Sequence, residues 1–204
     1  FENSENLINN TLLYVILPLS IIAMFAGTIM AIYEKDIKRL LAHSSVAQIG
    51  YITLAFAIGT KASIAAGFIH MFNHAIIKGG LFIAITSLGF FIQKRVTINN
   101  LSGLGRAMPI TFFCFVLCSL SLAGLPLTAG FISKLYLIKA TISSDAIWIA
   151  ILILISSALS VVYLWKMIEV MWMREGRKIL TKENPTIYIS LIMITFFNIY
   201  FGLD

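Results

Sequence analysis

The chain has 204 residues, of which 59 % are hydrophobic and only 12 % are charged. A soluble domain averages roughly 45–50 % apolar and about 25 % charged residues, so this composition excludes an ordinary soluble core and favours a chain surrounded mostly by the lipid bilayer. The formal net charge is +6. The basic residues lie in short loops between apolar segments, which is typical of membrane topology, so we expect no nucleic-acid partner.

Six apolar segments are long enough to cross a bilayer, because a hydrocarbon core of about 30 Å requires about 20 residues of helix. Backbone polar groups have to be paired within lipid, so each segment is predicted to be a helix. In chain order, the predicted helices cover about residues 12–33, 40–58, 64–92, 110–139, 146–173 and 186–203. We therefore predict that residues 1–204 form a single all-α, polytopic transmembrane helix bundle. The chain begins with Phe1 and without a signal-peptide pattern, so we expect it to be part of a longer protein.

The loops between these helices differ sharply in charge. Ten basic residues follow the first, third and fifth predicted helices: Lys35, Lys38, Arg39, Lys94, Arg95, Arg106, Arg174, Arg177, Lys178 and Lys182. The loops on the other side contain one, Lys61. By the positive-inside rule, the three basic loops are predicted to be cytoplasmic, with both ends of the chain on the opposite side. We expect an integral, multi-pass protein of the bacterial inner (cell) membrane.

Three ionisable side chains, His70, His74 and Lys78, lie near the middle of the third predicted helix. Their spacing of four residues keeps them along one helix face, over about 12 Å of its axis. An ionisable group at membrane depth is energetically costly and usually has a function. Histidine exchanges protons near neutral pH, and a lysine removed from water releases its proton more readily than in solution. The row therefore predicts a proton relay.

Two other interpretations of this row remain open from the sequence. Histidines four residues apart can bind a metal ion, but the helix offers no carboxylate or cysteine beside them and the adjacent lysine opposes a cation. We therefore expect no metal site and no cofactor in this chain. The second alternative is a structural role, in which the polar residues only tie helices together by hydrogen bonds.

The fourth predicted helix is expected to break near its middle. Pro126 removes a backbone donor and clashes with the preceding turn, and Gly124 and Gly130 flank it. Broken helices at membrane depth often line water-filled cavities and mark ion sites. Lys134 lies two turns beyond the break, so we predict a role in proton transfer. The alternative is a simple proline kink with a lysine that snorkels to the surface, which is our interpretation of Lys139.

The second predicted helix is unusually polar at its start. Lys38 lies at the membrane boundary. The less specific interpretation of this lysine is that it anchors the helix at the membrane interface. His43, Ser44 and Gln48 follow it. We expect this half of the helix to line a water-filled channel.

Three segments resemble, in the same order, motifs of proton-translocating antiporter-like membrane subunits. The first is DIKRLLAHSSVAQIGY, residues 36–51, which looks like a D-x-K-R-x-L-A-Y-S-S segment. The second is HMFNHAIIK, residues 70–78, which resembles an H-x3-H-x3-K helix, and the third is LAGLPLTAGFISK, residues 122–134, which resembles a broken helix that ends in a lysine. The family includes the large membrane subunits of respiratory complex I, of Mrp-type multisubunit Na⁺/H⁺ antiporters and of related membrane-bound hydrogenases. The resemblance covers about residues 12 to 175.

This resemblance implies an inverted-repeat transporter fold, of which the chain is similar to the second repeat and the C-terminal helices. It implies a proton path through these residues: Lys38, His70, His74, Lys78 and Lys134. Two positions depart from the family pattern, because His43 stands where tyrosine is usual and Gly79-Gly80 stands where complex I members commonly have Ala-Leu. The second departure favours the Mrp branch.

We therefore predict proton translocation by a subunit of a multisubunit ion-translocating complex, either an Mrp-type cation/proton antiporter or an NADH-quinone oxidoreductase. The expected partners are other membrane subunits and protons, with Na⁺ as a further candidate. No redox or nucleotide motif occurs in the chain, so any enzymatic chemistry is expected to belong to other subunits. The alternative is a structural membrane scaffold subunit without its own proton path.

Overall fold

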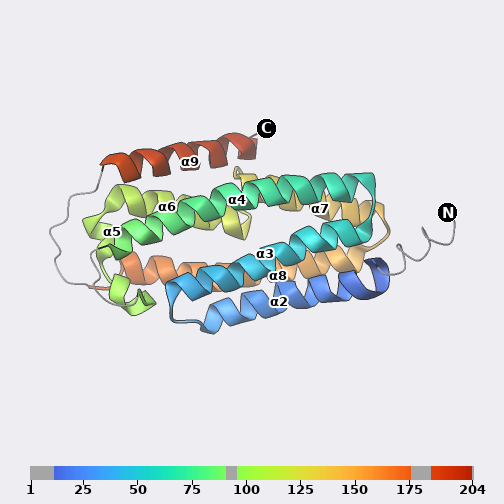
Figure 1. Cartoon of the computed structure of the whole chain (residues 1–204), viewed down its shortest axis with the longest axis horizontal. Coiled ribbons are helices and arrows are strands. Elements are labelled where there is room, and N and C mark those ends of the chain that lie inside the picture. Colours follow the sequence, from blue (N-terminus) through green and yellow to red (C-terminus); the bar gives the residue numbers. More distant parts are fainter. Residues whose placement is uncertain (1–11, 91–95, 176–184, 204) are drawn as a thin grey trace.

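The computed structural model describes residues 12–90, 96–175 and 185–203 (Figure 1). These residues form helices, turns and one isolated bridge between Asp36 and Thr97. The elements in chain order are the π-helical turn η1 (Leu12–Ile16), α2 (Leu17–Tyr33), α3 (Ile37–Ile58), α4 (Lys61–Gly89), the 3-10 turn η2 (Ile98–Leu101), α5 (Leu104–Ala107), α6 (Pro109–Ala123), α7 (Ala129–Ser143), α8 (Ile147–Trp172) and α9 (Pro185–Leu203). The all-α prediction is confirmed.

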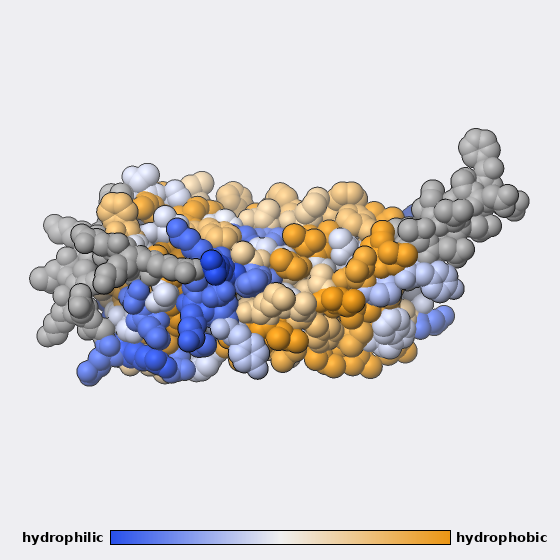
Figure 2. Space-filling model, turned by 60° about the horizontal axis from the view of Figure 1, so that its bottom comes forward, coloured by the Kyte–Doolittle hydropathy of each residue, from blue (hydrophilic) through white to orange (hydrophobic). Residues whose placement is uncertain are grey.

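The long helices lie side by side along the long axis of the bundle and alternate in direction (Figure 1). The C-terminal ends of α2, α4 and α8 meet at the same end, where hydrophilic side chains gather, whereas apolar side chains cover the middle (Figure 2). Five of the ten basic loop residues are described, and all belong to this end: Lys35, Lys38, Arg39, Arg106 and Arg174. The other five lie outside the described residues: Lys94, Arg95, Arg177, Lys178 and Lys182.

Five helical stretches are each long and apolar enough to cross a membrane: Tyr14–Tyr33, Ile37–Ile58, Lys61–Gly89, Ile147–Trp172 and Thr186–Leu203. The segment Ile98–Ala107 and α6 are together also long and apolar enough, but they are bent by 120° and so do not form one straight span. Helices α6 and α7 have 15 residues each. At a length of about 22 Å, neither spans a hydrocarbon core of about 30 Å alone. They follow one another along the bundle, so the two together form an interrupted span (Figure 1).

The predicted break near Pro126 is confirmed, because residues 124–128 separate α6 from α7. The segment extends one turn beyond its predicted end at about residue 139, since α7 continues to Ser143. Helices α3 and α4 also begin a turn earlier than their apolar segments predict. The side chain of Asp36 accepts a hydrogen bond from the amide of Arg39, and the Thr60 hydroxyl accepts one from a backbone amide of α4, so these polar residues cap the two helices.

The bundle turns many of its large apolar side chains outward and keeps a set of polar side chains inside. Large apolar residues that are half exposed or more include Phe68, Ile151, Val162 and Phe196. The buried polar residues include Ser44, Gln48, His70, Asn73, Lys78, Ser133 and Lys134. Such an arrangement is typical of a protein whose outer surface faces lipid and whose ionisable groups face the bundle interior.

Candidate functional site

The interruption between α6 and α7 forms a site for a cation. Helix α6 ends at Ala123, and the chain then turns through Gly124 and Leu127, which have left-handed φ angles of 90° and 68°. The last carbonyl groups of a helix have no intrahelical partner and carry the negative end of the helix dipole. The end of α6 therefore presents acceptors with partial negative charge inside the bundle.

Lys134, in the second turn of α7, occupies this site. Its Nζ donates hydrogen bonds to the carbonyl oxygens of Leu122 at 2.9 Å and Ala123 at 3.1 Å, and to Ser157 Oγ of α8 at 2.9 Å. These three acceptors match the three donors of an ammonium group. Lys134 is only 4 % exposed, so the alternative of a lysine that snorkels to the surface is wrong for this residue. Lys139, near the end of α7, is exposed as predicted.

Lys78 is buried in a comparable way between α4 and α3. Its Nζ donates to the carbonyl oxygen of Leu41 at 2.7 Å and to the hydroxyl of Ser44. Ser44 also shares a hydrogen bond with the side chain of Tyr163 on α8. Lys78 is 6 % exposed, so its ammonium group is held inside the bundle by acceptors of the polar half of α3.

His70 lies between the two lysines and bridges α3 and α7. Its Nε2 is 3.0 Å from Gln48 Oε1, and its Nδ1 is 2.8 Å from Ser133 Oγ. Because an amide oxygen only accepts, Nε2 carries hydrogen, and Nδ1 of the neutral ring accepts from the Ser133 hydroxyl. That hydroxyl is also 3.1 Å from the carbonyl oxygen of Gly130, to which it can donate when the ring is protonated. Both protonation states of His70 therefore have a complete set of partners.

Two further rings line the space between these groups. The Tyr51 ring lies 5.3 Å from Lys134 Nζ and 5.6 Å from the His70 ring, measured to ring centroids. The His70 and His74 rings are stacked with centroids 6.5 Å apart. Among the described residues, the buried Nδ1 of His74 has no hydrogen-bond partner. Since both nitrogens of His70 are already paired, a proton passing from His70 to His74 needs an intermediate such as a water molecule.

The structure does not bring Lys38 to this row. Lys38 is exposed on the first turn of α3, at the basic end of the bundle, whereas His70 and Lys78 are buried. Its position fits the less specific interpretation of the sequence, in which Lys38 anchors the helix at the membrane interface. The role that the resemblance implies for Lys38 stays a prediction.

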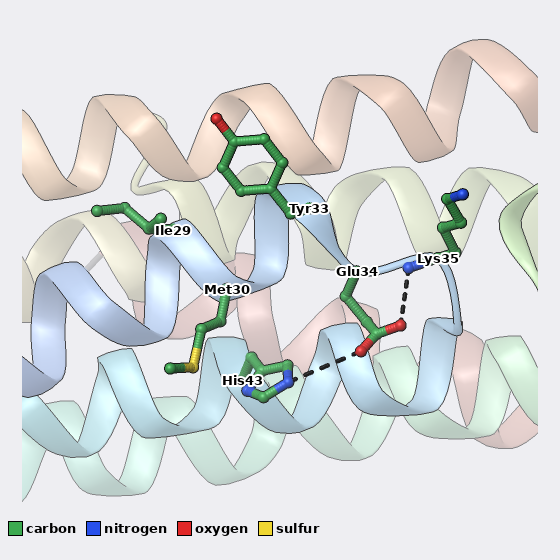
Figure 3. A pocket seen from close by; sticks show the side chains of 6 residues that line it. All are labelled: Ile29, Met30, Tyr33, Glu34, Lys35 and His43. Atoms are coloured by element: carbon green, nitrogen blue, oxygen red, sulfur yellow. Dashed lines mark hydrogen bonds and ion pairs between the residues drawn. The ribbon is translucent and has the colours of Figure 1, made fainter.

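His43 also lies apart from the buried row, in a surface pocket of about 460 Å³ between α2 and α3 (Figure 3). Its Nε2 is 3.8 Å from Glu34 Oε2, and the two side chains are 34 % and 22 % exposed. Glu34 Oε1 accepts hydrogen bonds from the backbone amides of Asp36 at 3.0 Å and Lys35 at 2.8 Å. These two amides, together with nearby positive charge, hold the pKa of Glu34 below its ordinary value. The carboxylate therefore stabilises the turn between α2 and α3.

Sequence reasoning missed three of the residues that complete the site: Tyr51, Ser133 and Ser157. Tyr51 and Ser133 belong to the segments that carry the family resemblance, so they were present but not singled out. A signal for Ser157 was also available, because Ser156 and Ser157 are adjacent polar residues in an otherwise strongly apolar helix.

Comparison with known proteins identifies the family. The model of the family described as "NADH:quinone oxidoreductase/Mrp antiporter, TM" matches residues 4–160. The chain is 35 % identical over 162 residues to F(420)H(2) dehydrogenase subunit N of Methanosarcina mazei, covering 76 % of this chain and 33 % of that protein. It is 40 % identical over 144 residues to NADH-quinone oxidoreductase subunit N of Desulforudis audaxviator, covering 70 % of this chain and 28 % of that protein. The chain thus spans about a third of the length of these relatives.

Solved structures share the same fold. A chain of the Mrp complex from Dietzia sp. DQ12-45-1b superposes with a TM-score of 0.86 at 22 % identity, covering 94 % of this chain and 44 % of that one. A chain of the archaeal membrane-bound sulfane sulfur reductase, a respiratory membrane complex, superposes with a TM-score of 0.85 at 31 % identity, covering 94 % and 32 %. Together with the apolar helices, these matches show that the chain is an integral, multi-pass membrane protein of the NADH:quinone oxidoreductase/Mrp antiporter transmembrane family.

Proposed function

We propose that this chain carries one half of a proton path in a membrane subunit of an ion-translocating complex, with the row Lys134–His70–His74–Lys78 as the relay. One observation carries the proposal: the buried side chains of His70, Lys78 and Lys134 lie inside the bundle with the half-buried His74, next to a helix interruption. Groups of this kind at membrane depth are the usual components of proton pathways. The region is also the part of the chain that matches the family model.

Lys134 is the group that exchanges protons with one side of the membrane. The carbonyl groups of Leu122 and Ala123 favour its charged form, whereas removal from water disfavours that form. A lysine under these opposing influences can take up and release a proton without leaving its site. Tyr51 separates it from His70, so the transfer between them uses water or a movement of the lysine side chain.

His70 passes the proton along the row by exchanging hydrogen bonds. In the neutral ring, Nδ1 accepts from Ser133, and after protonation it donates to the same hydroxyl, which turns to the carbonyl of Gly130. His74 and Lys78 follow at intervals of one helical turn, about 6 Å along the axis, a distance that one bridging water can cover. Lys78 then delivers the proton laterally toward the rest of the full-length subunit.

The family relationship also supports proposals about partners and location. We propose that the chain assembles with other membrane subunits of an Mrp-type or NADH-quinone oxidoreductase-type complex, and that those subunits carry the redox or cation-exchange chemistry, including any transport of Na⁺. The chain itself then needs no metal ion or cofactor. We further propose that the end of the bundle with Lys35, Lys38 and Arg106 faces the cytoplasm of a bacterial cell membrane, because basic loops are retained on that side.

The test of the relay uses Lys78→Ala in the full-length protein within its complex, reconstituted into liposomes. Proton pumping, followed with a pH-sensitive dye, is expected to fall roughly 100-fold, the usual scale for losing an acid–base group, while the complex still assembles. Lys166→Ala is the matched control, because Lys166 is an exposed lysine of α8. Pumping at the unmodified rate in Lys78→Ala would contradict the proposal.

A structural scaffold is the second candidate function, because the same hydrogen bonds tie helices together. Lys134 joins α7 to α6 and α8, and Lys78 joins α4 to α3. If this is their main role, Lys78→Ala reduces the amount of assembled complex on a native gel, but the pumping rate per assembled complex stays unchanged.

A further inference from the structure

Helix α9 carries a buried amide at the level of the helix interruption. Asn198 is 1 % exposed, although most of the large apolar side chains on α9 face outward. The helix lies against α4, α6 and α7 (Figure 1), beyond the residues that the family model matches. A buried amide within a membrane requires hydrogen-bond partners, so the partner of Asn198 indicates what α9 holds in place.

Asn198 interacts with two side chains of α6, those of Cys118 and Ser121, and Ser121 connects three helices. The Ser121 hydroxyl donates to Asn198 Oδ1 at 2.7 Å and accepts from the backbone amide of Gly130 at 3.1 Å. The amide of Gly130 is one of the first in α7, which have no partner within their own helix. One hydrogen-bonded chain therefore runs from α9 through the last turn of α6 to the first turn of α7, across the interruption.

Two close backbone contacts reinforce this connection. A Cβ atom at Gly130 would collide with the carbonyl group of Ser121, and a Cβ atom at Gly202 would collide with the backbone of Thr128. Only glycine allows these backbone segments to approach each other this closely. Helix α9 thus contacts the interruption at two points, through the side chain of Asn198 and through the backbone of Gly202.

The same region determines which acceptors the Lys134 side chain can reach. Lys134 lies one turn beyond Gly130 on the same face of α7, and its carbonyl acceptors belong to Leu122 and Ala123, which directly follow Ser121. A shift of the end of α6 relative to the start of α7 therefore changes the distances from Lys134 Nζ to both carbonyl oxygens.

We propose that Asn198 and Ser121 are positioning residues, which hold the interruption so that Lys134 meets its acceptors. This inference rests on the proposed function of Lys134 as a proton-exchange group. It assigns a role in the relay to α9, a helix whose described residues include no lysine, arginine, histidine, aspartate or glutamate.

The experiment compares Asn198→Leu, which keeps the branching at Cγ but accepts no hydrogen bond, with Asn198→Asp, which keeps an oxygen acceptor. Met193→Leu is the control on the same helix, because Met193 is 56 % exposed. Each variant is measured in the full-length protein within its complex, as pumping rate per assembled complex across a range of pH, and by hydrogen exchange of residues 124–131. Lys134→Ala is measured alongside.

Asn198→Leu is expected to lower the pumping rate per complex roughly fivefold, the scale of one lost hydrogen bond, to shift the pH profile, and to speed exchange in residues 124–131. Asn198→Asp should recover most of the rate, and Met193→Leu should leave it unchanged. An unchanged rate and pH profile in Asn198→Leu, while Lys134→Ala stops pumping, overturns the positioning role alone. If Lys134→Ala also pumps normally, the proposed function itself fails.

Discussion

The replacement Lys134→Met separates the electrostatic role of the lysine from its packing. Methionine has a similar length and fills the same space, but it donates no hydrogen bond. The Ala123 carbonyl keeps a hydrogen bond from Ser157 Oγ at 2.6 Å, so the carbonyl oxygen of Leu122 is the main acceptor that loses its side-chain partner. We therefore expect a local structural change confined to the end of α6.

The expected stability change is small because two effects oppose each other. A buried acceptor left without its partner costs about 1–3 kcal/mol. Removing a buried charge recovers a desolvation penalty of comparable size, since ion burial costs several kcal/mol in proteins. The net change in the free energy of unfolding should therefore stay within about 2 kcal/mol, a shift in Tm below roughly 8 °C.

Proton pumping should respond much more strongly than stability. In reconstituted liposomes, Lys134→Met is expected to lower the pumping rate roughly 100-fold or more, because the acid–base group is lost. Lys134→Arg provides the decisive comparison: the guanidinium group keeps the charge and the hydrogen bonds but does not release its proton at accessible pH. It should assemble normally and pump as poorly as Lys134→Met. If Lys134→Arg pumps at the unmodified rate, proton release at this position is unnecessary and the reasoning is refuted.

Two more predictions concern the partners of the relay and the edge of the bundle. Gln48→Leu removes the acceptor of the His70 Nε2 hydrogen, so the ring loses its fixed orientation. The pumping rate is expected to fall roughly tenfold, with little change in assembly. If the variant and the unmodified protein pump at the same rate at every pH, Gln48 does not have this role. Glu34→Gln tests the turn after α2. Because hydrogen bonds from the two following amides lower the pKa of Glu34 below its ordinary value of 4.5, its carboxylate stabilises the fold above that pH, and this stabilisation is lost as the pH falls through the lowered pKa. The variant should therefore have a lower Tm than the unmodified protein at pH 7, and the difference should vanish in acid; a Tm difference that is constant with pH would contradict the assignment.

Much of the fold was predictable because its determinants are local. The apolar segments, the lysines and arginines between them, and the proline between two glycines are properties of short stretches of chain. The spacing of His70, His74 and Lys78 places them on one helix face in any regular helix. Helix boundaries were less accurate, since caps such as Asp36 and Thr60 extend a helix beyond its apolar residues.

The sequence by itself therefore determined that this chain is a helical membrane protein with a row of ionisable groups and a broken helix. Only the tertiary structure decided what each group meets. Lys134 finds its acceptors at the end of α6 and on α8, His70 finds Gln48 and Ser133 on two other helices, and Lys38 stays at the surface. The physical reason is that hydropathy and helical period act along the chain, whereas hydrogen bonds between helices depend on how those helices pack. A buried ammonium group is stable only where packing brings acceptors to it.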